Sequence, residues 1–182
     1  MCVIFLAFNT RADYPLVLAA NRDEFYNRPA AAAGYWTDHP DIFGGRDLAG
    51  GGAWLGVTRS GRFAAVTNYR DGKSAMGTVT RGNLTADFLK GSEPAEEYLA
   101  RVESRAGDFS GFNLIIGEIS PARREIFHYS NREGRIIKLE AGTYALSNHL
   151  LNTRGPRSKR EWNDFRPFYK PRRSTAKRYS AC

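Results

Sequence analysis

The chain has 182 residues and a mass of 20.4 kDa, enough for one domain with a substantial hydrophobic core. Its hydrophobic content of 42% and aromatic content of 13% exclude a disordered protein, and no apolar run approaches the ~20 residues of a membrane-spanning helix. We expect a cytoplasmic protein, because Val3–Phe8 is too short for a signal peptide and two cysteines, Cys2 and Cys182, predict no disulfide framework.

The net charge of +8 is concentrated at one end of the chain. Residues 153–182 hold ten of the 27 basic and two of the 19 acidic residues, which leaves 17 of each in residues 1–152. A basic tail can bind phosphate groups, but the body is neutral. Nucleic-acid binding would therefore depend on the tail alone, and we expect no nucleic-acid partner.

The first residues predict a hairpin. Cys2–Phe8 is apolar and β-prone, residues 9–15 are rich in turn formers, and Leu16–Ala20 is a second apolar run. If the two strands are antiparallel, the polar cluster Asn21-Arg22-Asp23-Glu24 at the far end of the second strand returns to Cys2. This cluster is either a self-solvating surface loop or a set of paired charges at the mouth of a site.

The middle of the chain is less regular. Residues 30–52 contain many glycines and little periodicity, so we expect a loop, and they lack the Gly-Lys-Ser/Thr ending of a phosphate-binding loop. Ala53–Thr58 and Arg62–Asn68 flank a short glycine-containing turn and predict a second hairpin.

The second half predicts helices followed by strands. Arg81–Lys90 and Glu93–Ser104 have helical spacing, and the second has acidic residues in its early turns. Further strands are expected at Phe112–Ile119, Glu125–Tyr129 and Arg135–Leu139, and an apolar pattern resumes over Tyr144–Leu151. This order of elements indicates a layered α+β fold.

Cys2 is the first candidate for chemistry. A small residue after Met1 favours removal of the initiator methionine, which would leave Cys2 with both a thiol and a free α-amine. The amine can serve as the base for its own thiol, and a nearby guanidinium would lower the thiol pKa. The alternative is that a cysteine at position two is there by chance.

Several motifs, taken in order, resemble the NRDE family, also called transport and Golgi organisation protein 2 homologues. The resemblance covers roughly residues 1–152, and its one noted departure is Thr80, where the family more often has serine. It is carried by Met1-Cys2, Ala19-Ala20-Asn21-Arg22-Asp23-Glu24-Phe25, Arg28-Pro29, Gly51-Gly52-Ala53-Trp54-Leu55-Gly56, Thr67-Asn68-Tyr69-Arg70, Thr80-Arg81-Gly82, Phe112-Asn113-Leu114 and Leu146-Ser147-Asn148.

The resemblance implies an αββα sandwich like that of the N-terminal-nucleophile (Ntn) hydrolases. It also implies a catalytic set of Cys2, Arg22 and Asp23, with Asn68 and Asn148 at the oxyanion and base positions. The function would be a cysteine amidohydrolase acting on a small non-peptide amide or acyl substrate, without a cofactor or metal. The alternative is a non-catalytic carrier or trafficking protein of the same fold, with haem as the named ligand.

From the residues themselves, Asp23 would accept hydrogen bonds from the N-terminal ammonium or Arg22, while Asn21 and Glu24 would hold the loop. The histidines His39, His128 and His149 lack metal-ligand spacing, and His149 alone is a candidate axial ligand for haem. The substrate and the oligomeric state are left open.

The basic tail prompts a separate hypothesis, that a frameshift separates residues 153–182 from the domain of residues 1–152. Permitted codons for Thr153 to Asp164, read one base early, encode Pro-Trp-Pro-Lys, the run that follows the Leu-Ser-Asn segment in the family. The sandwich would then be C-terminally incomplete. The alternative is a genuine basic tail. Resequencing the DNA tests the hypothesis, which predicts a broken frame near codon 153; a continuous frame through Cys182 would overturn it.

Overall fold

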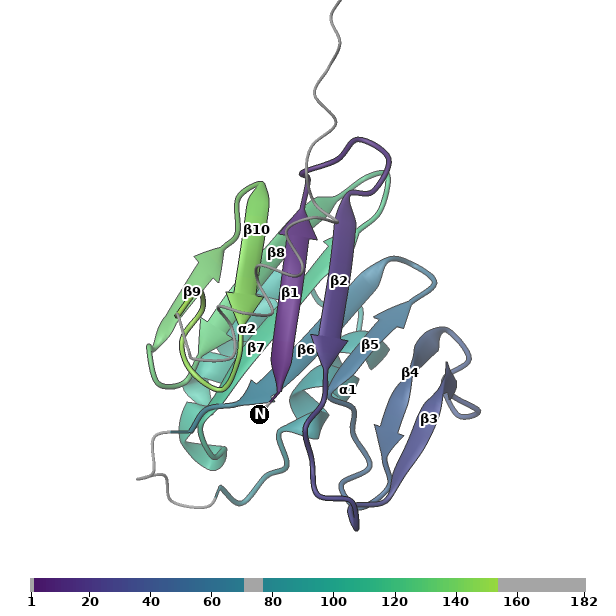
Figure 1. Ribbon diagram of the computed structural model, residues 1–182, viewed down its shortest axis with the longest axis vertical. Coiled ribbons are helices and arrows are strands. Elements are labelled where there is room, and N and C mark those ends of the chain that lie inside the picture. Colours follow the sequence, from purple (N-terminus) through teal and green to yellow (C-terminus); the bar gives the residue numbers. More distant parts are fainter. Residues whose placement is uncertain (1, 71–76, 154–182) are drawn as a thin grey trace, which may run out of the picture.

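The computed structural model describes residues 2–70 and 77–153 (Figure 1). The expected division at residue 153 therefore falls at the end of the described residues, and the tail lies outside them. The described elements, in chain order, are β1 (Val3–Phe8), β2 (Leu16–Asn21), β3 (Ala30–Tyr35), β4 (Ile42–Asp47), β5 (Leu55–Thr58), β6 (Arg62–Asn68), α1 (Gly82–Lys90), α2 (Ala95–Ser104), the 3-10 helix η1 (Ala106–Asp108), β7 (Phe112–Ile119), β8 (Arg124–Ser130), β9 (Arg135–Lys138) and β10 (Gly142–Leu146).

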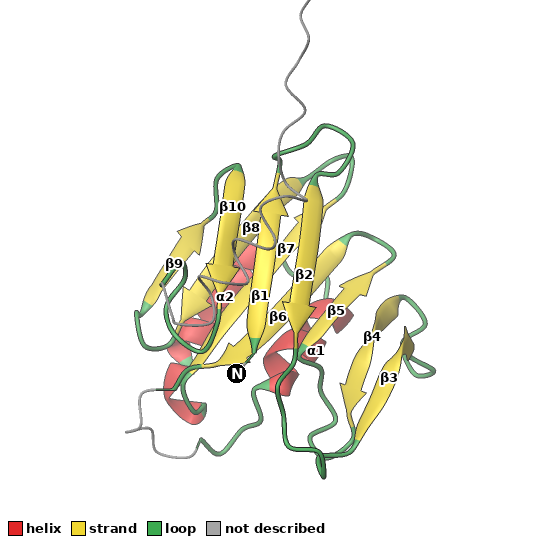
Figure 2. Cartoon of the chain, in the orientation of Figure 1, coloured by secondary structure: helices red, strands yellow, loops and turns green. Residues whose placement is uncertain are grey.

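The strands form two antiparallel sheets. The smaller has the order β10-β1-β2 and the larger the order β3-β4-β5-β6-β7-β8-β9. Both helices cover one face of the larger sheet, and the smaller sheet packs on the other (Figure 2). This confirms the α+β class. The described residues form helix, sheet and sheet layers, and the outer second helical layer of an αββα sandwich remains a prediction.

The central strands are apolar on both faces because each separates two cores. On β7, Leu114 and Ile116 face the helices, whereas Ile115 faces the smaller sheet. β6 alternates in the same way, with Val66 on the helical side and Phe63 between the sheets. Side chains of successive strand residues point to opposite faces, so a strand between two cores reads as a continuous apolar run.

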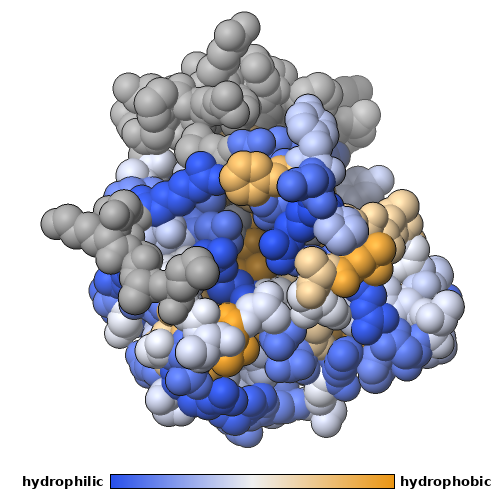
Figure 3. Space-filling model, turned by 90° about the horizontal axis from the view of Figure 1, so that it is seen from below, coloured by the Kyte–Doolittle hydropathy of each residue, from blue (hydrophilic) through white to orange (hydrophobic). Residues whose placement is uncertain are grey.

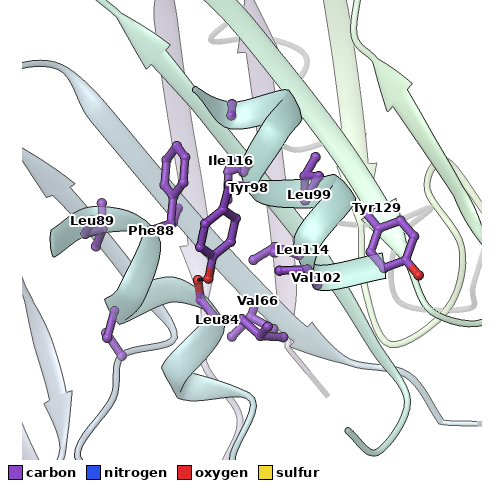
Figure 4. Close-up of a cluster of buried hydrophobic side chains, with 14 of the residues drawn as sticks. Val66, Leu84, Phe88, Leu89, Tyr98, Leu99, Val102, Leu114, Ile116 and Tyr129 are labelled. Atoms are coloured by element: carbon purple, nitrogen blue, oxygen red, sulfur yellow. Dashed lines mark hydrogen bonds between the residues drawn. The ribbon is translucent and has the colours of Figure 1, made fainter. Parts of the chain in front are cut away.

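The core under the helices is built from the apolar stripes of α1 and α2 (Figure 4). Tyr98 of α2 donates its hydroxyl to the carbonyl of Leu84 in α1 at 2.7 Å, which satisfies the one polar atom of that ring. Arg62 of β6 donates to the carbonyls of Phe88 and Glu93 at 2.9–3.3 Å and so fastens the connection between the helices to the sheet.

The core between the sheets fixes the register of β1. Ile4, Leu6 and Phe8 of β1 all contribute to it. Leu6 lies opposite Leu18 on β2 and opposite Tyr144 on β10. The expected antiparallel hairpin of the first two strands is confirmed. A one-residue slip would take Ile4, Leu6 and Phe8 out of the core between the sheets, so the position of the first residues of β1 is strongly specified.

Residues 30–52 do not form the expected loop. They contain β3 and β4, which make the edge of the larger sheet. β3 is mostly alanine and largely exposed, so its sequence carries no hydrophobic alternation. In β4, a Cβ on Gly44 would lie 2.7 Å from the carbonyl oxygen of Leu55, so glycine here permits close strand pairing.

Two other expected boundaries were displaced. α2 begins at Ala95 rather than Glu93, because Pro94 lies in an extended conformation at its N-cap. The last described strand ends at Leu146, and the apolar pattern continues to Leu151 through turns that follow it. Neither helix in the described ranges has the length and apolar character needed to cross a bilayer.

His128 yields a prediction about stability. It is fully buried on β8, neither ring nitrogen has a hydrogen-bond partner among the described residues, and burial lowers its pKa to about 4. An unfolded histidine titrates near ~6.5, so the unfolded chain binds more protons below that pH. We expect stability to fall as the pH drops from ~6.5 to 4, with His128 contributing a loss of about 3 kcal/mol.

Urea unfolding of the wild type and His128→Leu at several pH values measures this contribution. The variant should be more stable at low pH and lose less stability on acidification, because the titrating group is gone. His39→Leu is the matched control, since His39 lies partly exposed before β4 and should keep the wild-type pH profile. Parallel pH profiles for the wild type and His128→Leu would contradict the assignment.

Candidate functional site

The structure has a cavity at the place where the larger sheet extends beyond the edge of the smaller one. The smaller sheet ends at β2, while the larger sheet continues past it through β5, β4 and β3. A cavity of about 580 Å³ occupies this step. Its apolar walls come from Leu16 and Leu18 of β2 and from Phe43 and Val57 of the larger sheet. The sheet offset therefore produces a concave site, and the loop after β2 and the segment before α1 complete its wall.

The cavity is polar at one end because several strands reach their polar residues at the same edge. β2, β4 and β6 run in the same direction in Figure 1, and Arg22, Asp47 and Asn68 lie at or just past their C-terminal ends. Figure 3 views this end of the molecule, where hydrophilic side chains predominate and apolar ones form separate patches. The apolar wall lies further along the same strands.

Cys2 is the nucleophilic side chain at the polar end. It precedes β1, is half-buried, and lines the cavity. The backbone N–H of Asp23 donates to the sulfur at 3.4 Å. Burial raises the pKa of the Cys2 thiol, while the positive amino terminus and Arg22 act to lower it. The resting group is therefore a thiol that needs a base to become a nucleophile.

Ion pairs hold the loop after β2. Arg22 lies 3.7 Å from the Glu24 carboxylate, and both side chains line the cavity. Arg28 donates from Nε and Nη2 to one oxygen of Asp47, at 2.9 and 2.6 Å, which joins the loop to the end of β4. That contact, together with backbone N–H donors at Ala49 and Gly50, holds the pKa of Asp47 below its usual value despite burial.

The two predicted asparagines are neighbours. Asn68 ends β6 and lines the cavity beside Cys2. Asn148 donates its Nδ2 to the backbone oxygen of Asn68 at 2.8 Å, and its buried Oδ1 has no partner among the described residues. Asn148 thus supports the strand end that carries Asn68.

Arg81 enters the cavity through a close backbone contact. Gly52 and Gly82 lie so near each other that a Cβ on Gly52 would sit 2.3 Å from the Gly82 carbonyl carbon. This contact brings the start of α1 against the turn before β5 and places Thr80 and Arg81 on the cavity wall. Glycine is required where two backbones approach this closely.

The structure brings most of the predicted site together. Cys2, Arg22 and Asn68 line one cavity, and the main chain of Asp23 contacts the Cys2 sulfur. Asn148 reaches the site through Asn68. The roles assigned to these residues remain predictions. Sequence reasoning gave no site role to Glu24, Arg28, Asp47 or Arg81, although three of them lie inside quoted motifs.

Cofactor ligands are sparse at this cavity. No histidine in the described ranges lines it. His149 instead lies beside Tyr69. Its Nε2 is 3.4 Å from the Tyr69 hydroxyl, and its Nδ1 is 3.3 Å from the Thr153 hydroxyl. Cys2 is the one described side chain at the cavity wall of a type that ligates haem iron. The described residues form no group of three or more His, Cys, Asp or Glu able to hold a metal.

Comparison with known proteins gives a consistent family match. The family model described as Transport and Golgi organisation 2 matches residues 1–179. The chain is 40% identical over 162 residues to a Transport and Golgi organization protein 2 homolog from Bos taurus, and equally to that from Homo sapiens; each match covers 84% of this chain and 59% of the relative. Transport and Golgi organization protein 2 from Drosophila melanogaster is 32% identical over 134 residues, 67% of this chain and 47% of the relative.

These matches confirm the family resemblance expected from the ordered motifs. The chain spans about 59% of the length of the mammalian relatives. The activity of a whole relative therefore does not transfer with the match.

The Gly52 contact yields a prediction for this site. Gly52→Ala should destabilise the fold by about 1–3 kcal/mol, because the new methyl group meets backbone atoms rather than a flexible side chain. Urea unfolding measures the loss. Gly107→Ala is the control, since nothing lies within 4 Å of its Cβ position, and it should change stability by less than ~0.5 kcal/mol. Equal effects of the two substitutions would refute the packing argument.

Proposed function

The chain belongs to the transport and Golgi organisation 2 family, and on that premise we propose that it is an N-terminal cysteine amidohydrolase. The observation that carries the proposal is that Cys2 lines the same cavity as Arg22 and Asn68. Acyl transfer to a thiol requires a nucleophile, a cation and an amide donor, and all three lie around this one cavity.

The first chemical step needs a base, because burial raises the pKa of the thiol. After removal of Met1, the α-amine of Cys2 is covalently next to the thiol and can accept its proton. The sulfur then attacks the amide carbonyl carbon and forms a tetrahedral oxyanion. Asn68, which lines the same cavity, would donate its side-chain amide to that oxyanion, and Arg22 would stabilise the negative charge on the sulfur and then on the oxyanion.

Collapse of the oxyanion breaks the carbon–nitrogen bond. The leaving amine takes the proton held by the α-amine, and the acyl group remains on Cys2 as a thioester. Water then attacks the thioester, with the α-amine again as base, and releases the carboxylic acid. The net reaction consumes one water and one amide, and it yields one acid and one amine.

A carrier role is the second candidate, because the same cavity could hold an apolar ligand without turnover. Haem is the ligand proposed, and Cys2, which lines the cavity whereas His149 does not, would ligate its iron. The relatives' names refer to transport and Golgi organisation, and a trafficking role belongs with this candidate. A haem titration showing no Soret shift, or an equal shift for wild type and Cys2→Ala, would remove this assignment.

The reactivity of Cys2 tests the hydrolase proposal. Mass spectrometry of the purified protein should show that Met1 is absent. Arg22→Ala should alkylate more slowly at neutral pH, by about tenfold for each unit that the thiol pKa rises, since Arg22 lowers that pKa. Cys2→Ala should abolish amine release from a panel of amides, and Asn68→Ala should slow it ~100- to 1000-fold.

Arg59→Ala is the matched control. Arg59 stacks on the Tyr35 ring at 4.0 Å and does not line the cavity, so its removal should leave both alkylation and turnover unchanged. An intact Met1, or equal alkylation of wild type and Arg22→Ala, would sink the nucleophile assignment. Amine release that persists in Cys2→Ala would do the same.

A further inference from the structure

Four arginines line the cavity, and three of them already have carboxylate partners. Arg22 pairs with Glu24, and Arg28 pairs with Asp47. Arg46 pairs with Asp38, at 2.6 Å from Nη1 to one carboxylate oxygen and 2.9 Å from Nη2 to the other. Each of these guanidiniums is therefore neutralised by the protein itself.

Arg81 is the exception. It forms no ion pair with a described residue, and its hydrogen bond runs from Nη1 to the backbone oxygen of Gly111 at 3.1 Å. A guanidinium carries five N–H donors and stays charged in proteins, so one neutral acceptor leaves most of its capacity unused. Burial lowers the pKa of Arg81, which expresses the cost of holding this charge away from water. An anion in the cavity would offset that cost.

The opposite part of the cavity has a different character. Leu16, Leu18, Phe43 and Val57 form a wall with no charged group among them, and Leu16 and Leu18 precede Arg22 along β2. At ~3.3 Å per residue, Leu16 lies about 20 Å along the strand from Arg22. The cavity is therefore long, with cations and Cys2 at one end and an apolar lining toward the other.

We propose that the substrate is an N-acyl amino acid, with its acyl chain on the apolar wall and its carboxylate on Arg81. This inference rests on the proposed function and names the substrate class of the same site. The amide then lies between the two anchors, at the polar end where Cys2 stands. With the acyl chain on the apolar wall, the amine side of the substrate carries the negative charge to Arg81, the cavity arginine without a carboxylate partner among the described residues.

The reaction on such a substrate balances without a further reagent. Cys2 takes the acyl group and releases the free amino acid, whose nitrogen gains the thiol proton. Water then cleaves the thioester, so that its oxygen joins the acyl carbon and the thiol is restored. The products are one fatty acid and one amino acid.

Direct binding separates this inference from the question of turnover. Calorimetric titrations with N-decanoylglycine and its neutral analogue N-decanoylglycinamide use the full-length Cys2→Ala protein, so that no cleavage interferes. We expect the carboxylate to bind about 10- to 100-fold more tightly, the effect of one or two charged hydrogen bonds. Adding Arg81→Gln should remove this preference, Arg81→Lys should keep part of it, and Arg59→Gln should leave it intact.

Each outcome decides one question. No carboxylate preference in the Cys2→Ala protein overturns the inference whatever the variants do, as does a preference that survives Arg81→Gln. If Arg81→Gln does not fold, the Cys2→Ala protein is titrated with N-acetylglycine, which lacks the long acyl chain, and an affinity equal to that for N-decanoylglycine overturns the apolar anchor. Carboxylate-selective binding that depends on Arg81, without cleavage by the wild type, refutes the hydrolase proposal and leaves the binding assignment standing.

Discussion

The register of β1 is the constraint on which the site depends. Ile4, Leu6 and Phe8 pack into the core between the sheets, and β2 and β10 pair with β1 on its two sides. Because side chains alternate along a strand, a shifted register would remove these three residues from that core. The start of β1 is therefore fixed, and this fixes the position of Cys2, which lies one residue before the strand. Hydrophobic packing of the strand thus positions the nucleophile, and the backbone of Asp23 adds a direct contact to its sulfur.

The same physics explains which parts of the fold were predictable. β1, β6 and β7 are buried strands whose apolar runs are plain in the sequence, and the helices carry apolar stripes of the right spacing. β3 was missed because an exposed alanine strand has no alternation to read. The pairing of Gly44 on β4 with Gly56 on β5 could not be predicted either. Glycine is needed at Gly44 because the two backbones approach closely, and this approach is known only when the partner strand is known.

Some residues of the candidate site could also be predicted from the sequence, and others could not. Cys2, Arg22 and Asn68 could be named because they lie at strand ends within recognisable motifs. Arg81 could not, because its place on the cavity wall depends on the contact between Gly52 and Gly82, thirty residues apart in sequence. Whether an arginine forms an ion pair with a carboxylate likewise depends on the folded chain. Nothing in the sequence distinguishes the arginines that find carboxylates from the one that does not.

The site combines two groups whose burial carries a cost. Burial raises the pKa of Cys2 and lowers that of Arg81, so each group is held in a setting that disfavours its charge. A ligand that carries neither a charge nor a metal would gain nothing from either group, since apolar walls alone supply its affinity. An anionic amide would pair its negative charge with Arg81 on binding. Its carbonyl carbon would accept nucleophilic attack by the deprotonated sulfur of Cys2. The two costs are offset when both groups act on the same molecule, and the site therefore favours an anionic ligand that engages Cys2 over a purely apolar one.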